Sequence, residues 1–130
     1  VQIEINEDEM TVTLTFQGEA LFPSGSAQLM PEFRRQLLNL AFLRDYQELD
    51  LLVQGHTDRV PLNRGLQYRT NWDLSASRAA SVGEFLLEQG FIQPHSLRVE
   101  GRADSMPISA EGDLNNYYLD RRVQVIITQQ

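Results

Sequence analysis

The order of hydrophobic periodicities along this chain is the feature that most limits its fold. Apolar residues alternate with polar ones over residues 1–5 and again over 10–16, and such period-two alternation predicts two strands that each bury one face. The acidic segment 6–9 between them is predicted to be a turn. We therefore expect the chain to open with a β-hairpin.

Helical spacing follows the hairpin. Pro31 stands where the first residue of a helix is expected, and side chains recur on one face four, seven and eight residues after Phe33. This pattern predicts one amphipathic helix that ends near Asp45. The apolar run at 49–54 then has the length and composition of a buried strand.

A second helix is predicted farther along the chain. It is expected over residues 74–89, with Asp73 as its N-cap and Gly90 as the residue that ends it. Short strands are predicted at 97–100 and, after a polar stretch, at 123–127. After its hairpin, the chain thus alternates helices and strands.

These elements predict an α+β fold with a single mixed β-sheet. Strand–helix–strand units favour right-handed parallel crossovers, whereas the end strands are expected to pair antiparallel. About four core strands would carry two or three helices on one face, because each amphipathic helix has to bury its apolar side. With 130 residues, the chain is expected to form one domain over 1–130, with its core at about 10–128.

Composition excludes several functional classes. The chain has no cysteine, so disulfides, zinc–thiolate sites and thiol nucleophiles are excluded. With two histidines a metal site is not expected, and no cofactor is predicted. The net charge is −7, all 11 basic residues are arginine, and residues 1–32 contain six acids and no base. Nucleic acid is therefore not an expected partner, because its binding depends on cation–phosphate contacts.

A long loop and an arginine on an apolar stripe mark a candidate binding site. The connection over residues 55–73 is longer than most strand-to-helix loops, and it lies where open sheets bind ligands. Arg78 falls between Leu74 and Val82 on the apolar face of the helix, where a guanidinium needs a partner or an opening. Asp58 could pair with it. The two residues would form either a structural ion pair or a site for a zwitterion, whose carboxylate and ammonium they would bind.

Five ordered motifs resemble the OmpA-like peptidoglycan-binding domain. They are Phe22-Pro-Ser-Gly-Ser-Ala-Gln-Leu29, Gly55-His-Thr-Asp58, Asn71-Trp-Asp-Leu-Ser75 with Arg78-Ala79-Ala80-Ser-Val82, Val99-Glu-Gly-Arg-Ala-Asp-Ser-Met-Pro107, and Asp120-Arg-Arg-Val123. Within the family, the sequence is most similar to the MotB-type flagellar stator proteins and to secretion-system proteins. The resemblance covers nearly all of the chain, although Pro23 stands where many members have Asp or Asn.

The resemblance implies both a site and a function. In the family, the residues at the positions of Asp58 and Arg78 hold the zwitterionic end of diaminopimelate in the peptidoglycan stem peptide. The other ligand-binding positions taken from the resemblance are Asn71, Thr57, Leu74 and Arg122. We therefore expect non-covalent peptidoglycan binding in the periplasm, which would anchor a membrane protein or complex to the cell wall. The membrane anchor would lie outside this chain, and a homodimer is plausible.

Two other functions stay open from the sequence alone. A protein-interaction or assembly domain would use Asp58 and Arg78 only as a structural ion pair, in a filled crevice. A cell-wall hydrolase would need a nucleophile or a metal constellation. The sequence offers no such set, so the chain is not expected to be an enzyme.

Overall fold

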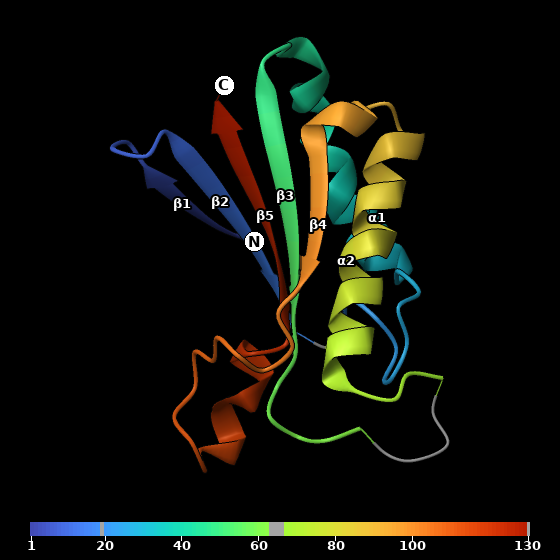
Figure 1. Cartoon of the computed structure of the whole chain (residues 1–130), viewed down its shortest axis with the longest axis vertical. Coiled ribbons are helices and arrows are strands. Elements are labelled where there is room, and N and C mark those ends of the chain that lie inside the picture. The colour runs from blue at the N-terminus through green and yellow to red at the C-terminus, as the bar shows by residue number, and fades with distance from the viewer. Residues whose placement is uncertain (19, 63–66, 130) are drawn as a thin grey trace.

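The computed structural model describes residues 1–18, 20–62 and 67–129. Its centre is a five-stranded mixed sheet with the order β1-β2-β5-β3-β4 (Figure 1). Strands β3 and β4 are parallel, and the β1–β2, β2–β5 and β5–β3 pairs are antiparallel. The strands are β1 (Gln2–Asn6), β2 (Thr11–Gln17), β3 (Leu49–His56), β4 (Leu97–Gly101) and β5 (Arg122–Gln129). The predicted α+β fold with a mixed sheet and an N-terminal hairpin is confirmed.

Two α-helices lie on the same side of the sheet (Figure 1). They are α1 (Pro31–Leu37) and α2 (Asn71–Glu88), and α2 packs on β3 and β4 as the crossover between these parallel strands. Three 3₁₀ segments complete the elements, namely η1 (Leu38–Asp45), η2 (Pro94–Ser96) and η3 (Leu114–Leu119). None of the helices in the described residues has the length and hydropathy needed to cross a bilayer.

The hydrophobic core lies between the sheet and the helices. Phe33 of α1 is fully buried, and its ring centroid lies 5.3 Å from that of Phe16 on β2 and 5.5 Å from that of Phe22. Val82 and Leu86 of α2 are also fully buried and belong to the same cluster. These contacts attach the segment between β2 and α1 to the helix layer, which places that segment beside the start of α2.

The first predicted helix has the expected bounds but not one helical geometry. It is α-helical over Pro31–Leu37 and then continues as the 3₁₀ segment η1. Leu37, Leu40 and Leu43 are buried, at a spacing of three residues. A 3₁₀ helix has three residues per turn, so this spacing keeps all three leucines on the core side.

The second predicted helix begins three residues earlier than expected. Thr70, rather than Asp73, is the N-cap, and its side-chain oxygen accepts a hydrogen bond of 3.1 Å from the Asp73 amide. Asp73 instead lies in the first turn, where a carboxylate interacts favourably with the helix dipole. Both residues are favourable near a helix start, which is why composition alone did not distinguish them.

The expectation that the first strand buries one face is wrong. Val1, Ile3 and Ile5 are 68%, 66% and 67% exposed, respectively. The β1–β2 register places Ile3 opposite Leu14, which is buried, so the apolar side of β1 faces the same way as the core. The helices, however, lie over the other strands, and the turn end of the β1–β2 hairpin points away from them (Figure 1).

Candidate functional site

A pocket of about 520 Å³ opens at the carboxyl end of β3. Its walls come from the segment after β2, the loop after β3, the start of α2 and the start of β5. All six residues that the sequence marked as a site line this one pocket: Thr57, Asp58, Asn71, Leu74, Arg78 and Arg122. The structure thus brings together residues that are up to 65 positions apart in the chain.

Two glycines allow the start of α2 to lie directly against the strand ends. A Cβ atom at Gly55 would lie 2.3 Å from the carbonyl oxygen of Ser75, and one at Gly101 would lie 2.4 Å from the amide nitrogen of Ala76. Any side chain at these positions would push the helix away from the sheet. The first turns of α2, with Asn71 and Leu74, are therefore held beside the loop that follows β3.

Arg78 is held by the segment after β2, and no carboxylate among the described residues forms an ion pair with it. Its Nε donates a hydrogen bond of 2.8 Å to the carbonyl of Ser26, and Nη2 donates one of 3.3 Å to the carbonyl of Pro23. The guanidinium carbon lies 4.8 Å from the centroid of the Phe22 ring, within cation–π range. Burial lowers the pKa of Arg78 to about 10, so the residue stays a cation at neutral pH.

Asp58 forms its ion pair with Arg121. Its Oδ2 lies 2.8 Å from Nη1 of Arg121, and its Oδ1 accepts a hydrogen bond of 3.0 Å from the Val60 amide. The structural ion pair between Asp58 and Arg78 that the sequence left open is therefore wrong. The two side chains instead stand as separately held charges in the walls of an open pocket.

Asn71 and Thr57 shape the loop between β3 and α2. The Asn71 side-chain amide donates to the carbonyls of Val60, at 3.1 Å, and Asp58, at 3.4 Å. Thr57 is buried, its amide donates to Ala103, and its hydroxyl donates to the Asp58 carbonyl. These bonds fix the main chain on both sides of the Asp58 carboxylate.

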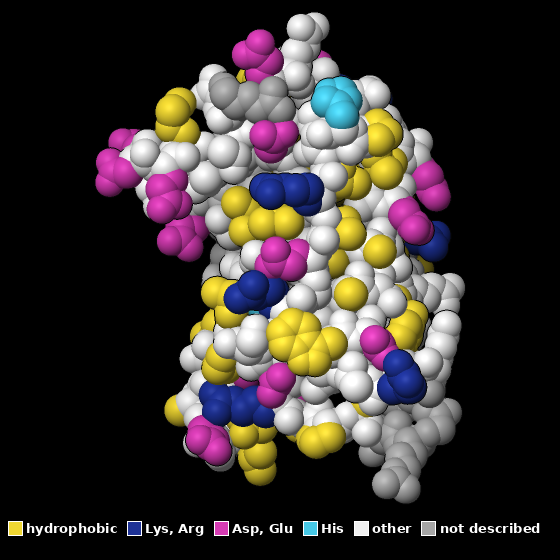
Figure 2. Space-filling model, viewed as in Figure 1, with side chains coloured by type: hydrophobic (Ala, Val, Ile, Leu, Met, Phe, Trp, Pro, Cys, Tyr) yellow, Lys and Arg dark blue, Asp and Glu magenta, His cyan; other side chains and the backbone are white. Residues whose placement is uncertain are grey.

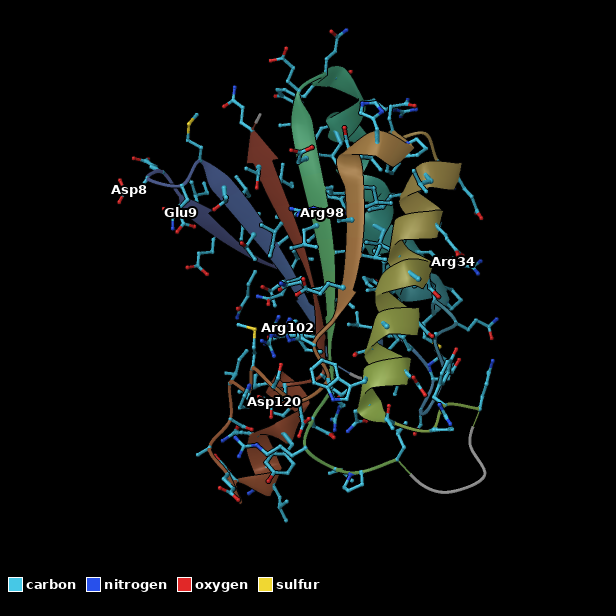
Figure 3. The ribbon with its side chains drawn as sticks, in the orientation of Figure 1. Asp8, Glu9, Arg34, Arg98, Arg102 and Asp120 are labelled. Carbon is cyan, nitrogen blue, oxygen red and sulfur yellow. The ribbon has the colours of Figure 1, made fainter. Side chains whose placement is uncertain are left out.

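Arg122 links the pocket to the segment 102–120. It is 6% exposed, and its guanidinium donates to the carbonyls of Asp120, at 3.2 Å, and Met106, at 2.9 Å. Burial lowers the pKa of Arg122, an effect that the nearby Asp120 carboxylate opposes. Asp120 itself lies at the base of this segment, below the sheet in Figure 3.

Among the described residues, the charge balance of the pocket lining is positive. Its lining includes three arginines, at positions 78, 121 and 122, and one carboxylate, that of Asp58. His56 also lines it, but burial and the neighbouring Arg122 and Arg102 lower its pKa to about 4, so it is neutral at pH 7. The described part of the lining is thus cationic, although the whole protein has a net charge of −7, and it favours anionic groups on a ligand.

Sequence reasoning missed two residues of this site. The family motif assigns the binding position to Arg122, but the adjacent Arg121 also lines the pocket. Phe22 lies within a quoted motif but was given no role. Its contact with Arg78 depends on the path of the segment after β2, which no local pattern predicts.

A comparison with protein-family models matches residues 21–118 to the OmpA family. The chain belongs to the OmpA family. The β1–β2 hairpin and β5 lie outside the matched region.

Individual relatives agree with this assignment. Motility protein B of Escherichia coli K12 is 31% identical over 85% of this chain and 35% of its own length. The chain spans about half of the length of YtxE from Bacillus subtilis and about a third of the length of LafU from Escherichia coli O44:H18. Its resemblance to the MotB-type members of the OmpA family is therefore confirmed.

Two solved structures share the whole fold. A MotB-like protein from Desulfovibrio vulgaris matches with a TM-score of 0.87 and 29% identity, over 98% of this chain and 82% of that one. The cell wall anchor of the type VI secretion system from Pseudomonas aeruginosa matches with a TM-score of 0.82 and 29% identity, over 98% and 88%. Both kinds of OmpA-family protein that the motifs resembled are thus represented among the structural neighbours.

Proposed function

We propose that this OmpA-family domain binds peptidoglycan without covalent chemistry and holds it through the diaminopimelate of the stem peptide. The observation that carries the proposal is the pocket at the end of β3, which Asp58 and Arg78 both line without pairing with each other. A fixed cation and a fixed anion in one pocket match the carboxylate and ammonium of an amino-acid end. The likeness to a cell wall anchor supports the same function.

Arg78 would bind the carboxylate of the ligand. Two of its five N–H donors are used by the carbonyls of Ser26 and Pro23, so three remain. The same two bonds and the Phe22 ring set the plane of the guanidinium before a ligand arrives. A preset fork loses little freedom on binding, and lysine cannot reproduce its geometry.

Asp58 would bind the ammonium group. Each of its oxygens already accepts one hydrogen bond, from Val60 and from Arg121, and a carboxylate has about four acceptor positions in all. An ammonium can therefore join without displacing Arg121. Lysine-type stem peptides lack the side-chain carboxylate of diaminopimelate, so they would leave Arg78 without its partner.

The domain would act as a wall anchor and not as an enzyme. Charge-assisted hydrogen bonds contribute about 1.5–3 kcal/mol each before ordering costs, so one pocket gives modest affinity. Firm anchoring would come from several copies on one wall. As such an anchor, the domain would lie in the periplasm and be tethered to a membrane in the full-length protein.

The test is an NMR titration of the ¹⁵N-labelled domain with a diaminopimelate-containing stem peptide and, in parallel, a lysine-containing one. We expect shifts at Asp58, Asn71 and Arg78 with the first peptide alone. Arg78→Ala and Arg78→Lys should both weaken binding by roughly ten-fold or more. The matched controls are Arg98→Ala and Arg98→Lys, because Arg98 is an exposed arginine on β4 (Figure 3).

Two results would overturn the proposal. One is equal affinity of wild type and Arg78→Lys for the diaminopimelate peptide. The other is equal binding of the two stem peptides, which would show that the domain does not recognise the side-chain carboxylate of diaminopimelate. Pull-down with isolated cell-wall sacculi extends the same comparison to the intact polymer.

A further inference from the structure

The β1–β2 hairpin presents an uncovered apolar strip at the edge of the sheet. Ile3 and Ile5 of β1, and Val1 just before the strand, are each about two-thirds exposed. Ile5 is paired with Val12, and Ile3 with the buried Leu14, so the strip continues the core face of the sheet outward. No described helix covers this strip, so these three branched apolar side chains are exposed to solvent.

Among the described residues, no strand pairs with the outer side of β1. Its only sheet neighbour among the described residues is β2, so the outer row of amide and carbonyl groups is open to another strand. Edge strands are usually protected by proline, by a bulge or by an inward-pointing charge. Gln2–Asn6 has no proline, and its regular register shows no bulge.

The charge around this edge is strongly negative. Glu4 lies in the middle of β1, on the opposite face from Ile3 and Ile5, and is exposed. The turn that follows carries Glu7, Asp8 and Glu9, and acidic side chains gather over it in Figures 2 and 3. No basic residue occurs anywhere in residues 1–32. A second copy of this edge, or an anionic lipid surface, would meet like charge.

The geometry points to β1 as a docking edge for an extended segment of a partner protein in which apolar and basic side chains alternate. Added antiparallel or parallel to β1, such a strand would place its apolar residues beside Ile3 and Ile5 and its basic residues beside Glu4. The alternation of the partner would thus mirror the alternation of β1 itself.

This docking edge is separate from the pocket. The pocket lies at the carboxyl end of β3, near Gln17 and Arg122, whereas the acidic turn adjoins Thr11, which is paired with Thr128 at the other end of the sheet. The hairpin also lies outside the region that matches the OmpA family model. Binding at β1 therefore does not depend on the proposed wall-binding function, and both could occur at once.

The test uses synthetic nine-residue peptides with blocked ends, titrated into the ¹⁵N-labelled domain. The probe alternates isoleucine with arginine. One control alternates isoleucine with glutamate, and another has the probe's composition in an order that breaks the alternation. We expect the probe alone to shift and protect the amides of Gln2–Asn6, with binding that weakens as salt is raised.

Three variants locate the contact. Ile3→Ser/Ile5→Ser should weaken probe binding by roughly ten-fold or more, because two apolar contacts are lost. Glu4→Arg should reverse the preference, so that the glutamate peptide binds better than the arginine peptide. Val99→Ser is the matched control, since Val99 is exposed on β4, the opposite edge of the sheet. All four side chains are exposed, so the fold should persist, and thermal unfolding checks this.

Several outcomes would overturn the proposal. These are equal binding of the arginine and glutamate peptides, unchanged affinity of the Ile3→Ser/Ile5→Ser variant, or shifts outside the hairpin. Self-association of the free domain that Ile3→Ser/Ile5→Ser abolishes would show that a second copy covers the edge instead. Titration with the diaminopimelate peptide, repeated on each variant, reports separately on the pocket.

Discussion

Replacement of Asp120 tests how the segment 102–120 is held in place. Asp120 is completely buried and accepts three hydrogen bonds, from the amides of Ile108 and Ser109, both at 2.8 Å, and from the Ser109 hydroxyl, at 2.5 Å. Arg121 and Arg122 follow it directly in the chain. Loss of this carboxylate should therefore disturb both stability and the pocket.

The expected loss of stability on replacing Asp120 follows from these three hydrogen bonds. A hydrogen bond to a charged group contributes about 1.5–3 kcal/mol, and Asp120→Ala removes the acceptor from all three donors. The variant no longer has to bury a charge, so the net loss of stability is smaller than the sum of the three hydrogen-bond contributions. We expect Asp120→Ala to lower the free energy of unfolding by about 3–5 kcal/mol. Asp120→Asn keeps the oxygen that the two amides use and should lose only about 1–2 kcal/mol.

The pH dependence of stability gives a second measure of what the Asp120 carboxylate contributes. Burial acts to raise the pKa of Asp120, but the hydrogen bonds from Ser109 and Ile108, together with the charge of Arg59, outweigh it, and the pKa is lowered. The stabilisation is therefore present above the ordinary carboxyl pKa, about 3.9, and is lost as the pH falls below it. Asp120→Asn should unfold with a flatter pH dependence in this acid range.

Urea denaturation at pH 7 and across pH 2–6 measures both effects. Asp104→Ala is the control, because Asp104 is an exposed acid in the same segment and its replacement should change stability by less than about 0.5 kcal/mol. The reasoning would be refuted if Asp120→Ala were within about 1 kcal/mol of wild type at pH 7 with an unchanged acid limb.

Three further predictions concern positions that the structure singles out. His56 is buried and its pKa is lowered to about 4, so the free energy of unfolding should fall by roughly 2–3 kcal/mol from pH 6.5 to pH 4. In urea denaturation, His56→Gln should reduce this pH dependence, whereas replacement of the exposed His95 by Gln should not. Gly55→Ala should lower the free energy of unfolding by roughly 2 kcal/mol or more, because its Cβ would meet Ser75 of α2 at 2.3 Å. An unchanged denaturation midpoint for Gly55→Ala would mean that α2 can shift to accommodate the added Cβ without loss of stability. Thr70→Ala should cost about 1 kcal/mol through the lost N-cap, whereas Thr70→Ser should restore most of it.

Local sequence patterns predicted most of the elements and the main residues of the pocket. The alternation in β2 and β5, the apolar run in β3 and the glycine after α2 are signals within one segment, and each was interpreted correctly. Arg78 stood out because a charge on an apolar stripe is unfavourable without a partner or an opening. The motifs that resembled the OmpA family added Asn71, Thr57, Leu74 and Arg122, and all line the pocket.

Two features of the pairing between distant segments required the tertiary structure. The insertion of β5 between β2 and β3 depends on pairing between distant segments. The choice of Arg121 as the partner of Asp58 depends on which of two adjacent arginines turns toward the loop.

The exposure of β1 shows the same limit most clearly. Its alternation predicted a strand correctly, and it also gave β1 an apolar face. Whether that face is buried depends on which strands the helices cover. The described helices do not cover β1, and its apolar side chains stay exposed. Periodicity records which side of a strand is apolar, because it is a property of neighbouring residues. Only the packing of the layers decides what, if anything, lies against that side.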